Sequence, residues 1–177
     1  MKMIAIGVLV AVAGAGSASA DVTYTFTNQT WTGFNFSQLT NAGDLSGFLS
    51  AVSVNAVLHS SVSDTWGDDL TIYLDDIPLS TGGPLQVGGF SSLGATSHLF
   101  WANGGSDVPG TTVIDTQTLG TPIDISTYPV WLGNGYGAAG TSGTWSGSIT
   151  LHGVNVPTPG AMALLGMGGL LVSRRRR

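Results

Sequence analysis

Apolar and polar residues alternate with a period of two along much of the chain between residues 21 and 156. Over 22–27, three apolar side chains point one way and three threonines point the other way. The same alternation recurs over 51–58, 69–74 and 145–153. A period of two is typical of strands that bury one face, so the pattern predicts half-buried strands at these four places.

Shorter apolar runs, separated by segments rich in Gly, Asn, Asp and Pro, predict further strands. Strong helix formers are nearly absent, because the region from 21 to 156 contains no Glu, Lys or Arg. About nine short strands indicate an all-β protein, an antiparallel β-sandwich of jelly-roll-like type, with a closed barrel as the main rival. A single helical turn is allowed within 37–51. The shorter runs are 31–36, 85–90, 97–101, 111–115 and 129–132.

Charge is divided unevenly along the chain. The five basic residues are Lys2 and Arg174, Arg175, Arg176 and Arg177, whereas all ten acidic residues are Asp and lie between Asp21 and Asp124. Such a body repels phosphate backbones, so the sequence argues against nucleic-acid binding. The chain has no cysteine, which excludes disulfides and thiolate metal sites.

The N-terminus has the organisation of a secretory signal peptide. Lys2 precedes an apolar run over 3–13, and Ala18 and Ala20 place small residues where signal peptidase requires them. We therefore expect a signal helix over 1–20, cleavage after Ala20, and a body that spans 21–156. The alternative is a buried N-terminal helix or a permanent anchor.

A second apolar run, over 160–172, precedes the four terminal arginines. As a helix, its 13 residues would span roughly 20 Å, which is short for a bilayer core about 30 Å thick. The arginines would hold their end in the cytoplasm while the body, with no positive charge, is free to cross. This arrangement predicts that the acidic domain is exported.

The last 21 residues resemble the PEP-CTERM sorting signal of Gram-negative bacteria, in which a Pro-Glu-Pro motif precedes a short transmembrane helix and a basic end. Here Pro157, Thr158 and Pro159 take the place of the motif, with Thr158 where that family usually has Glu. The resemblance implies that 157–177 is read by an exosortase at the inner membrane and removed near the motif. It further implies delivery to the cell surface or extracellular matrix. An ordinary C-terminal membrane anchor is the alternative.

Two segments, 52–74 and 143–153, are similar to the P domain that accompanies subtilisin-like convertases. In that domain a strand, an acidic loop and an L-T-I-x-L strand follow one another in this order, as they do over 52–74. The resemblance implies a β-sandwich and is used for the fold alone.

Five carboxylates flank the predicted LTIYL strand over 70–74, and clustered oxygen ligands of this kind can hold Ca²⁺. They match no EF-hand spacing, so the alternative is that they are solubilising acids on loops. No other cofactor is predicted. The five residues are Asp64, Asp68, Asp69, Asp75 and Asp76.

No recognisable catalytic motif is present. His59, His98 and His152 lack neighbouring metal ligands at a known spacing and are interpreted as structural or surface residues. Ser146 lies in a strand pattern without the strand-to-helix turn of a nucleophile elbow. A carboxylate pair for glycoside hydrolysis is not favoured either, because the chain has no Glu. We therefore predict no enzymatic activity.

The positions of the five tryptophans allow a second function, carbohydrate binding. Trp31, Trp66 and Trp145 each follow a Thr and closely precede a Gly, and Trp101 and Trp131 add two more. Core packing is the favoured interpretation, and stacking on sugar rings is the alternative. The sequence thus predicts an exported structural or adhesive protein of an exopolysaccharide-rich matrix. A carbohydrate-binding module, with Trp rings exposed on one face, is the alternative, and an extracellular hydrolase with converging His, Asp and Ser is the third candidate.

Overall fold

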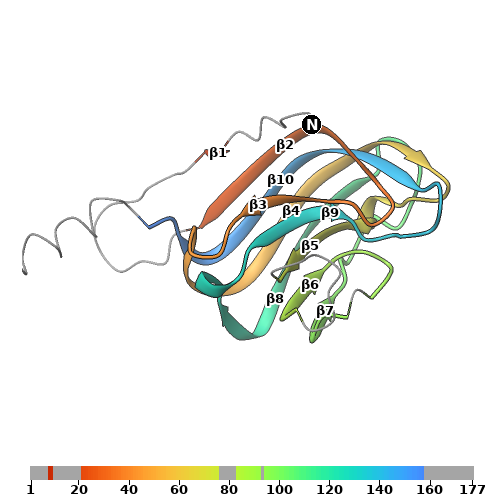
Figure 1. Ribbon diagram of the computed structural model, residues 1–177. Coiled ribbons are helices and arrows are strands. Elements are labelled where there is room, and N and C mark those ends of the chain that lie inside the picture. Colours follow the sequence, from red (N-terminus) through yellow and green to blue (C-terminus); the bar gives the residue numbers. More distant parts are fainter. Residues whose placement is uncertain (1–7, 10–20, 76–82, 93, 158–177) are drawn as a thin grey trace, which may run out of the picture.

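The computed structural model of the protein describes residues 8–9, 21–75, 83–92 and 94–157 (Figure 1). In this part of the chain the only helical elements are two three-residue 3₁₀ turns, η1 (Gly67–Asp69) and η2 (Ile125–Thr127). All other regular structure is strand, arranged in two five-stranded sheets. The predicted all-β, sandwich-like fold is confirmed, while its jelly-roll-like character stays a prediction.

The first sheet contains the longest strands and is antiparallel throughout. Its centre is formed by β10, which pairs with β2 on one side and β4 on the other. Its order is β1 (Val8–Leu9), β2 (Val22–Thr32), β10 (Ser142–Asn155), β4 (Ser46–Val62) and β8 (Thr112–Asp124).

The second sheet is shorter and mixed. Strands β6 and β7 run parallel, which corrects the prediction of a purely antiparallel sandwich. The connection over 88–96 returns the chain to the same end of the sheet before β7 begins, which a tight hairpin cannot do. Its order is β3 (Phe36–Thr40), β9 (Val130–Asn134), β5 (Leu70–Leu74), β6 (Leu85–Val87) and β7 (Ser97–Leu99).

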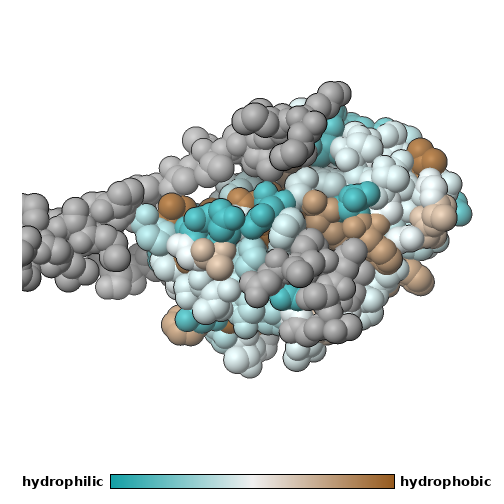
Figure 2. Space-filling model, viewed as in Figure 1, coloured by the Kyte–Doolittle hydropathy of each residue, from teal (hydrophilic) through white to brown (hydrophobic). Residues whose placement is uncertain are grey.

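The core lies between the two sheets, which form separate layers in Figure 1. On β4 the buried residues are Val52, Val54, Ala56 and Leu58, the face that the alternation predicts. Every residue of β5 is buried, so the half-buried strand predicted over 69–74 is in fact buried on both faces. Outside the core the surface is mostly of intermediate hydropathy, with few strongly apolar patches on the face shown in Figure 2. Ser, Thr and Gly therefore cover much of a body that lacks Lys and Arg.

Two local predictions between residues 31 and 51 are wrong. The strand expected over 31–36 is interrupted, because β2 ends at Thr32 and Gly33 takes a positive φ of 54°. The helical turn expected within 37–51 is absent: β3 and β4 occupy most of this stretch. Between them the Asp44 carboxylate accepts hydrogen bonds from the backbone and side-chain amides of Asn41, which stabilises a turn instead of a helix.

Both predicted terminal helices fall largely outside the described residues. Within 1–20 only Val8–Leu9 is described, and it forms strand β1 against β2 rather than a helix. Ala18, Ala20, Asp76 and everything after Pro157 lie outside the description. No helix in the described part is long and apolar enough to cross a membrane.

Candidate functional site

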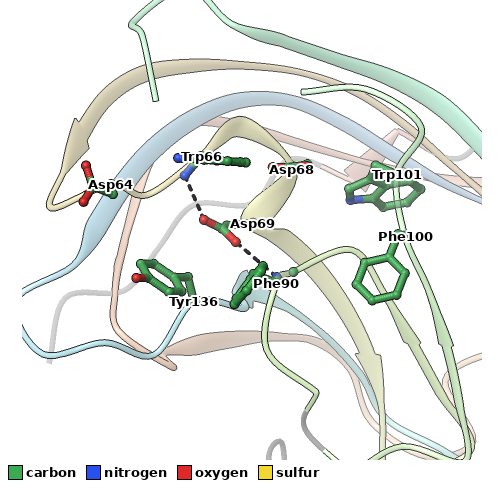
Figure 3. Close-up of a pocket in the computed structure, with 9 residues that line it drawn as sticks. Asp64, Trp66, Asp68, Asp69, Phe90, Phe100, Trp101 and Tyr136 are labelled. Atoms are coloured by element: carbon green, nitrogen blue, oxygen red, sulfur yellow. Dashed lines mark hydrogen bonds between the residues drawn. The ribbon is translucent and has the colours of Figure 1, made fainter. Parts of the chain in front are cut away.

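A pocket of about 320 Å³ lies where β4 ends and β5 begins (Figure 3). Four connections contribute to its wall: the segment between β4 and β5, the residues after β6, those after β7 and those after β9. The wall combines aromatic rings with carboxylates. Its lining residues are Asp64, Trp66, Asp68, Asp69, Gly89, Phe90, Phe100, Trp101 and Tyr136.

Trp66 is held in place by the turn that follows β4. Ser63 and Asp64 both have positive φ, 55° and 59°, so the chain reverses sharply there. The next residue, Thr65, is buried and donates from its hydroxyl to the Val62 carbonyl. Gly67 then donates its N–H to the Ser106 carbonyl at 2.9 Å. With its backbone fixed on both sides, the Trp66 ring remains 45% exposed.

Asp69 links two of the connections that form the wall. Its side chain is only 3% exposed, and its two carboxylate oxygens accept N–H bonds from Trp66 at 2.7 Å and Phe90 at 3.1 Å (Figure 3). Burial raises the pKa of Asp69 to about 6, because loss of hydration outweighs these two bonds, and the nearby Asp68 acts in the same direction. Burial also raises the pKa of Asp68.

Two glycines place Phe90 at the rim of the pocket. Gly88 and Gly89 have φ of 81° and 79°, which other residues rarely adopt. A Cβ on Gly88 would lie 2.2 Å from both the Leu70 carbonyl oxygen and Trp101 Nε1, so any side chain there is excluded. The Phe90 ring that follows is 74% exposed and meets Tyr136 edge to face, with ring centroids 6.0 Å apart.

The remaining aromatic residues divide into rim and floor. Phe100 is 58% exposed, and its ring centroid lies 4.1 Å from that of His98. Trp101 is buried and donates from Nε1 to the Leu70 carbonyl at 2.7 Å. The rim therefore offers three exposed rings, Trp66, Phe90 and Phe100, beside the three aspartates. Such a surface can stack on the apolar face of a ligand while carboxylate oxygens accept hydrogen bonds from its polar edge.

The structure brings together three of the five predicted calcium ligands. Asp64, Asp68 and Asp69 line the pocket, whereas Asp75 follows the far end of β5. The five residues of β5, Leu70–Leu74, separate Asp75 from Asp69 by roughly 20 Å of extended chain, so Asp75 cannot share their site. Among the described residues, no group of three or more His, Cys, Asp or Glu side chains is placed to hold a metal ion.

The three histidines lie apart, on β4, β7 and β10, but His152 has partners that the sequence did not reveal. Its Nε2 lies 2.6 Å from Ser53 Oγ, and its Nδ1 lies 2.9 Å from an Asp21 carboxylate oxygen. Asp21 also accepts the Gly153 N–H at 3.3 Å. The atoms thus follow the order of a Ser-His-Asp triad.

The surroundings of Ser53 do not suit hydrolysis. An oxyanion hole needs free N–H donors, but β4 pairs with β10 on one side and β8 on the other at Ser53. The Ser53 hydroxyl is also hydrogen-bonded to Thr116 Oγ1 at 2.7 Å. Ser53 and His152 are not among the residues that line the pocket. The contact therefore serves to fasten Asp21, at the start of the body, to β10.

The tryptophans are mostly structural, and the residues that the sequence reasoning missed are other aromatics. Trp31, Trp101 and Trp145 are buried, as core packing predicts, and Trp66, at 45%, is the most exposed of the five. Phe90 and Tyr136 were not singled out, although a glycine pair precedes the first and glycines flank the second. Aromatic residues beside glycines in turns were the available signal.

No family model, no curated protein and no solved structure matches this chain. The resemblances drawn from the sequence therefore stay predictions. What the chain does has to be inferred from the pocket, the charge distribution and the two termini.

Proposed function

We propose that this protein is an exported, non-enzymatic protein of structural or adhesive type, and that it adheres by binding a saccharide in the pocket described above. The observation that carries the proposal is the combination of three exposed rings, Trp66, Phe90 and Phe100, with Asp64, Asp68 and Asp69 around one cavity. This arrangement favours the carbohydrate-binding alternative in a modified form, because Phe rings replace the expected second exposed Trp.

Sugars suit this wall chemically. A pyranose has an apolar C–H face, which an aromatic ring covers, and a hydroxyl-bearing edge, which donates to carboxylates. The cavity of about 320 Å³ is at the lower end of the range for small-molecule sites, about 300 to 1,000 Å³. Because the cavity is small and its rim is exposed, we expect it to hold one short stretch of a longer polysaccharide.

Replacing Trp66 with alanine is expected to weaken binding about tenfold or more, since exposed Trp at the centre of a contact commonly dominates affinity. Folding should be little affected, because the ring is 45% exposed. Affinity electrophoresis of the full-length protein in polysaccharide from the producing cells' own matrix measures the effect. Phe48→Ala is the control: Phe48 is 63% exposed and lies near the start of β4, whereas the pocket lies beyond its end. An equal loss in both variants would contradict the assignment.

The termini are proposed to deliver the body to the cell surface or matrix. A signal peptide over 1–20 is removed after Ala20 by signal peptidase, and the tail over 157–177, with its short apolar run, is read by an exosortase at the inner membrane. The position of Asp21 supports the first cut, because its carboxylate bonds to His152 and Gly153 of β10 and so fixes the start of the mature body. We expect a mature protein of residues 21 to about 159, which its intact mass would reveal.

The absence of enzymatic activity is tested at Ser53. Ser53 and Ser146 both contact a histidine, at His152 and His59, but only the histidine beside Ser53 also contacts a carboxylate, that of Asp21. We expect no covalent adduct after incubation with a fluorophosphonate, because no free N–H donor stabilises an oxyanion beside it. Mass spectrometry of the intact protein gives the answer. An adduct at Ser53 that disappears in His152→Ala would establish a working nucleophile and reject the non-enzymatic assignment.

A further inference from the structure

The charges around the pocket indicate which class of saccharide binds there. Asp64, Asp68 and Asp69 all belong to its wall, and the whole region from 21 to 173 contains no Lys or Arg. From this geometry we propose that the bound saccharide carries a protonated amino group, so that the ligand is a polysaccharide containing free, unacetylated amino sugar. The inference rests on the proposed function and specifies its ligand.

The aspartates disfavour the other charge classes. An acidic polysaccharide would bring its carboxylates or sulfates against three aspartates with no cation to offset them. A neutral sugar would remove water from those carboxylates and return only hydroxyl hydrogen bonds. An ammonium group provides both hydrogen-bond donors and the missing positive charge, so it compensates the carboxylates that the ligand desolvates.

The aromatic rim of the pocket also favours a ligand that carries an ammonium group. The faces of Trp, Tyr and Phe rings carry partial negative charge and attract an ammonium group within about 6 Å of the ring centre. Trp66, Phe90 and Phe100 expose their rings around the same cavity that the aspartates line. A sugar that stacks on one of these rings therefore places an amino substituent near both the other rings and the carboxylates.

The surroundings of Asp69 also favour a ligand that carries an ammonium group. It is almost fully buried, its two oxygens are bonded to backbone amides, and burial raises its pKa to about 6. The nearby acid Asp68 reinforces this shift. The only described basic side chain in ring contact with the wall is His98, which stacks on Phe100. The carboxylate thus lacks a strong cationic partner, and an ammonium ligand would supply one.

The test compares three tetrasaccharides that share the β-1,4 linkage and differ in one substituent: glucosamine, N-acetylglucosamine and glucose. Calorimetric titration of the full-length protein at pH 6.5 and low salt should give at least tenfold tighter binding of the glucosamine tetramer. High salt should reduce this preference. The double variant Asp64→Asn, Asp68→Asn should reduce this preference to less than threefold, because these substitutions remove two of the three wall charges and keep the shape of both side chains. The matched control, Asp44→Asn with Asp124→Asn, removes two exposed charges from residues outside the pocket wall and should leave the preference unchanged.

The outcomes separate this inference from the proposed function. Equal binding of all three tetramers, or tightest binding of the acetylated one, would overturn the amino-sugar inference while saccharide binding stands. If trilysine competes as well as the glucosamine tetramer, the amino-sugar inference is also overturned, since the site would then bind cations that carry no sugar. Failure of every tetramer and of matrix polysaccharide to bind would reject the proposed function itself.

Discussion

Replacing Trp145 with alanine is expected to lower the free energy of unfolding by about 4 kcal/mol, in the range measured for buried large aromatic side chains. The ring is fully buried at the centre of the first sheet and packs against Trp31, with ring centroids 5.9 Å apart. Its Nε1 also donates to the Gly67 carbonyl at 3.1 Å. Truncation therefore leaves a large cavity and removes one of the two hydrogen bonds that the Gly67 carbonyl accepts, the other coming from the Leu70 N–H.

Urea denaturation of the full-length protein measures this loss of stability in Trp145→Ala. Two further variants show how much of the loss comes from the hydrogen bond and how it differs at an exposed tryptophan. Trp145→Phe should cost less, since most of the ring remains and mainly the bond to Gly67 is lost. Trp66→Ala should cost well under half as much as Trp145→Ala, because Trp66 is 45% exposed. Similar losses for Trp66→Ala and Trp145→Ala would show that the division into a structural and a binding tryptophan is wrong.

Asp69 is expected to make the protein more stable at pH 4 than at pH 7, by on the order of 3 kcal/mol. Its pKa rises from an ordinary 3.8 to about 6 in the folded state, so folding favours the protonated carboxyl. The stabilisation is fully present below pH 3.8 and is lost as the pH rises through 6. Asp68, with a pKa raised in the same direction, adds to the effect.

The measurement is the free energy of unfolding at intervals between pH 4 and pH 7. Asp69→Asn, which does not titrate, should flatten the profile over this window. Asp124→Asn serves as the control, because Asp124 is exposed and hydrogen bonds from Ser126 lower the pKa of its carboxyl. The contribution of Asp124 is lost only below the ordinary pKa, outside the window. Asp68 keeps part of the slope in this variant, so a slope as steep as that of the unmodified protein would contradict the role given to Asp69.

The positions of strands could be predicted from the sequence where apolar and polar residues alternate along a short segment. The patterns over 22–27, 51–58 and 145–153 fall within β2, β4 and β10, because side chains on opposite faces of a strand meet different environments. The second half of β8, from Thr116 to Asp124, was missed. Its Gly120 and Pro122 resemble a turn, and they lie where the pairing with β4 is interrupted, between the pairs Ala51–Thr118 and Leu49–Ile123. Pairing with β4 on both sides of this interruption continues the strand.

Only part of the pocket lining could be predicted from the sequence. Asp64, Trp66 and Asp68 lie within five residues, so their proximity follows from the sequence. Phe90 and Tyr136 arrive from distant connections, and nothing local indicates that both reach the same cavity. The contact between Ser53 and His152 likewise depends on the register of β4 against β10, which places Thr150 opposite Ser53. Long-range pairing of this kind is set by tertiary structure rather than by neighbouring residues.

Export followed by processing at both ends can be measured as the intact mass of the protein in separated cytosol, membrane and extracellular-matrix fractions of the producing cells. We predict that the matrix fraction contains a species that begins at Asp21 and ends near Pro159. A chain confined to the cytosol that still carries Met1 and Arg177 would contradict the account.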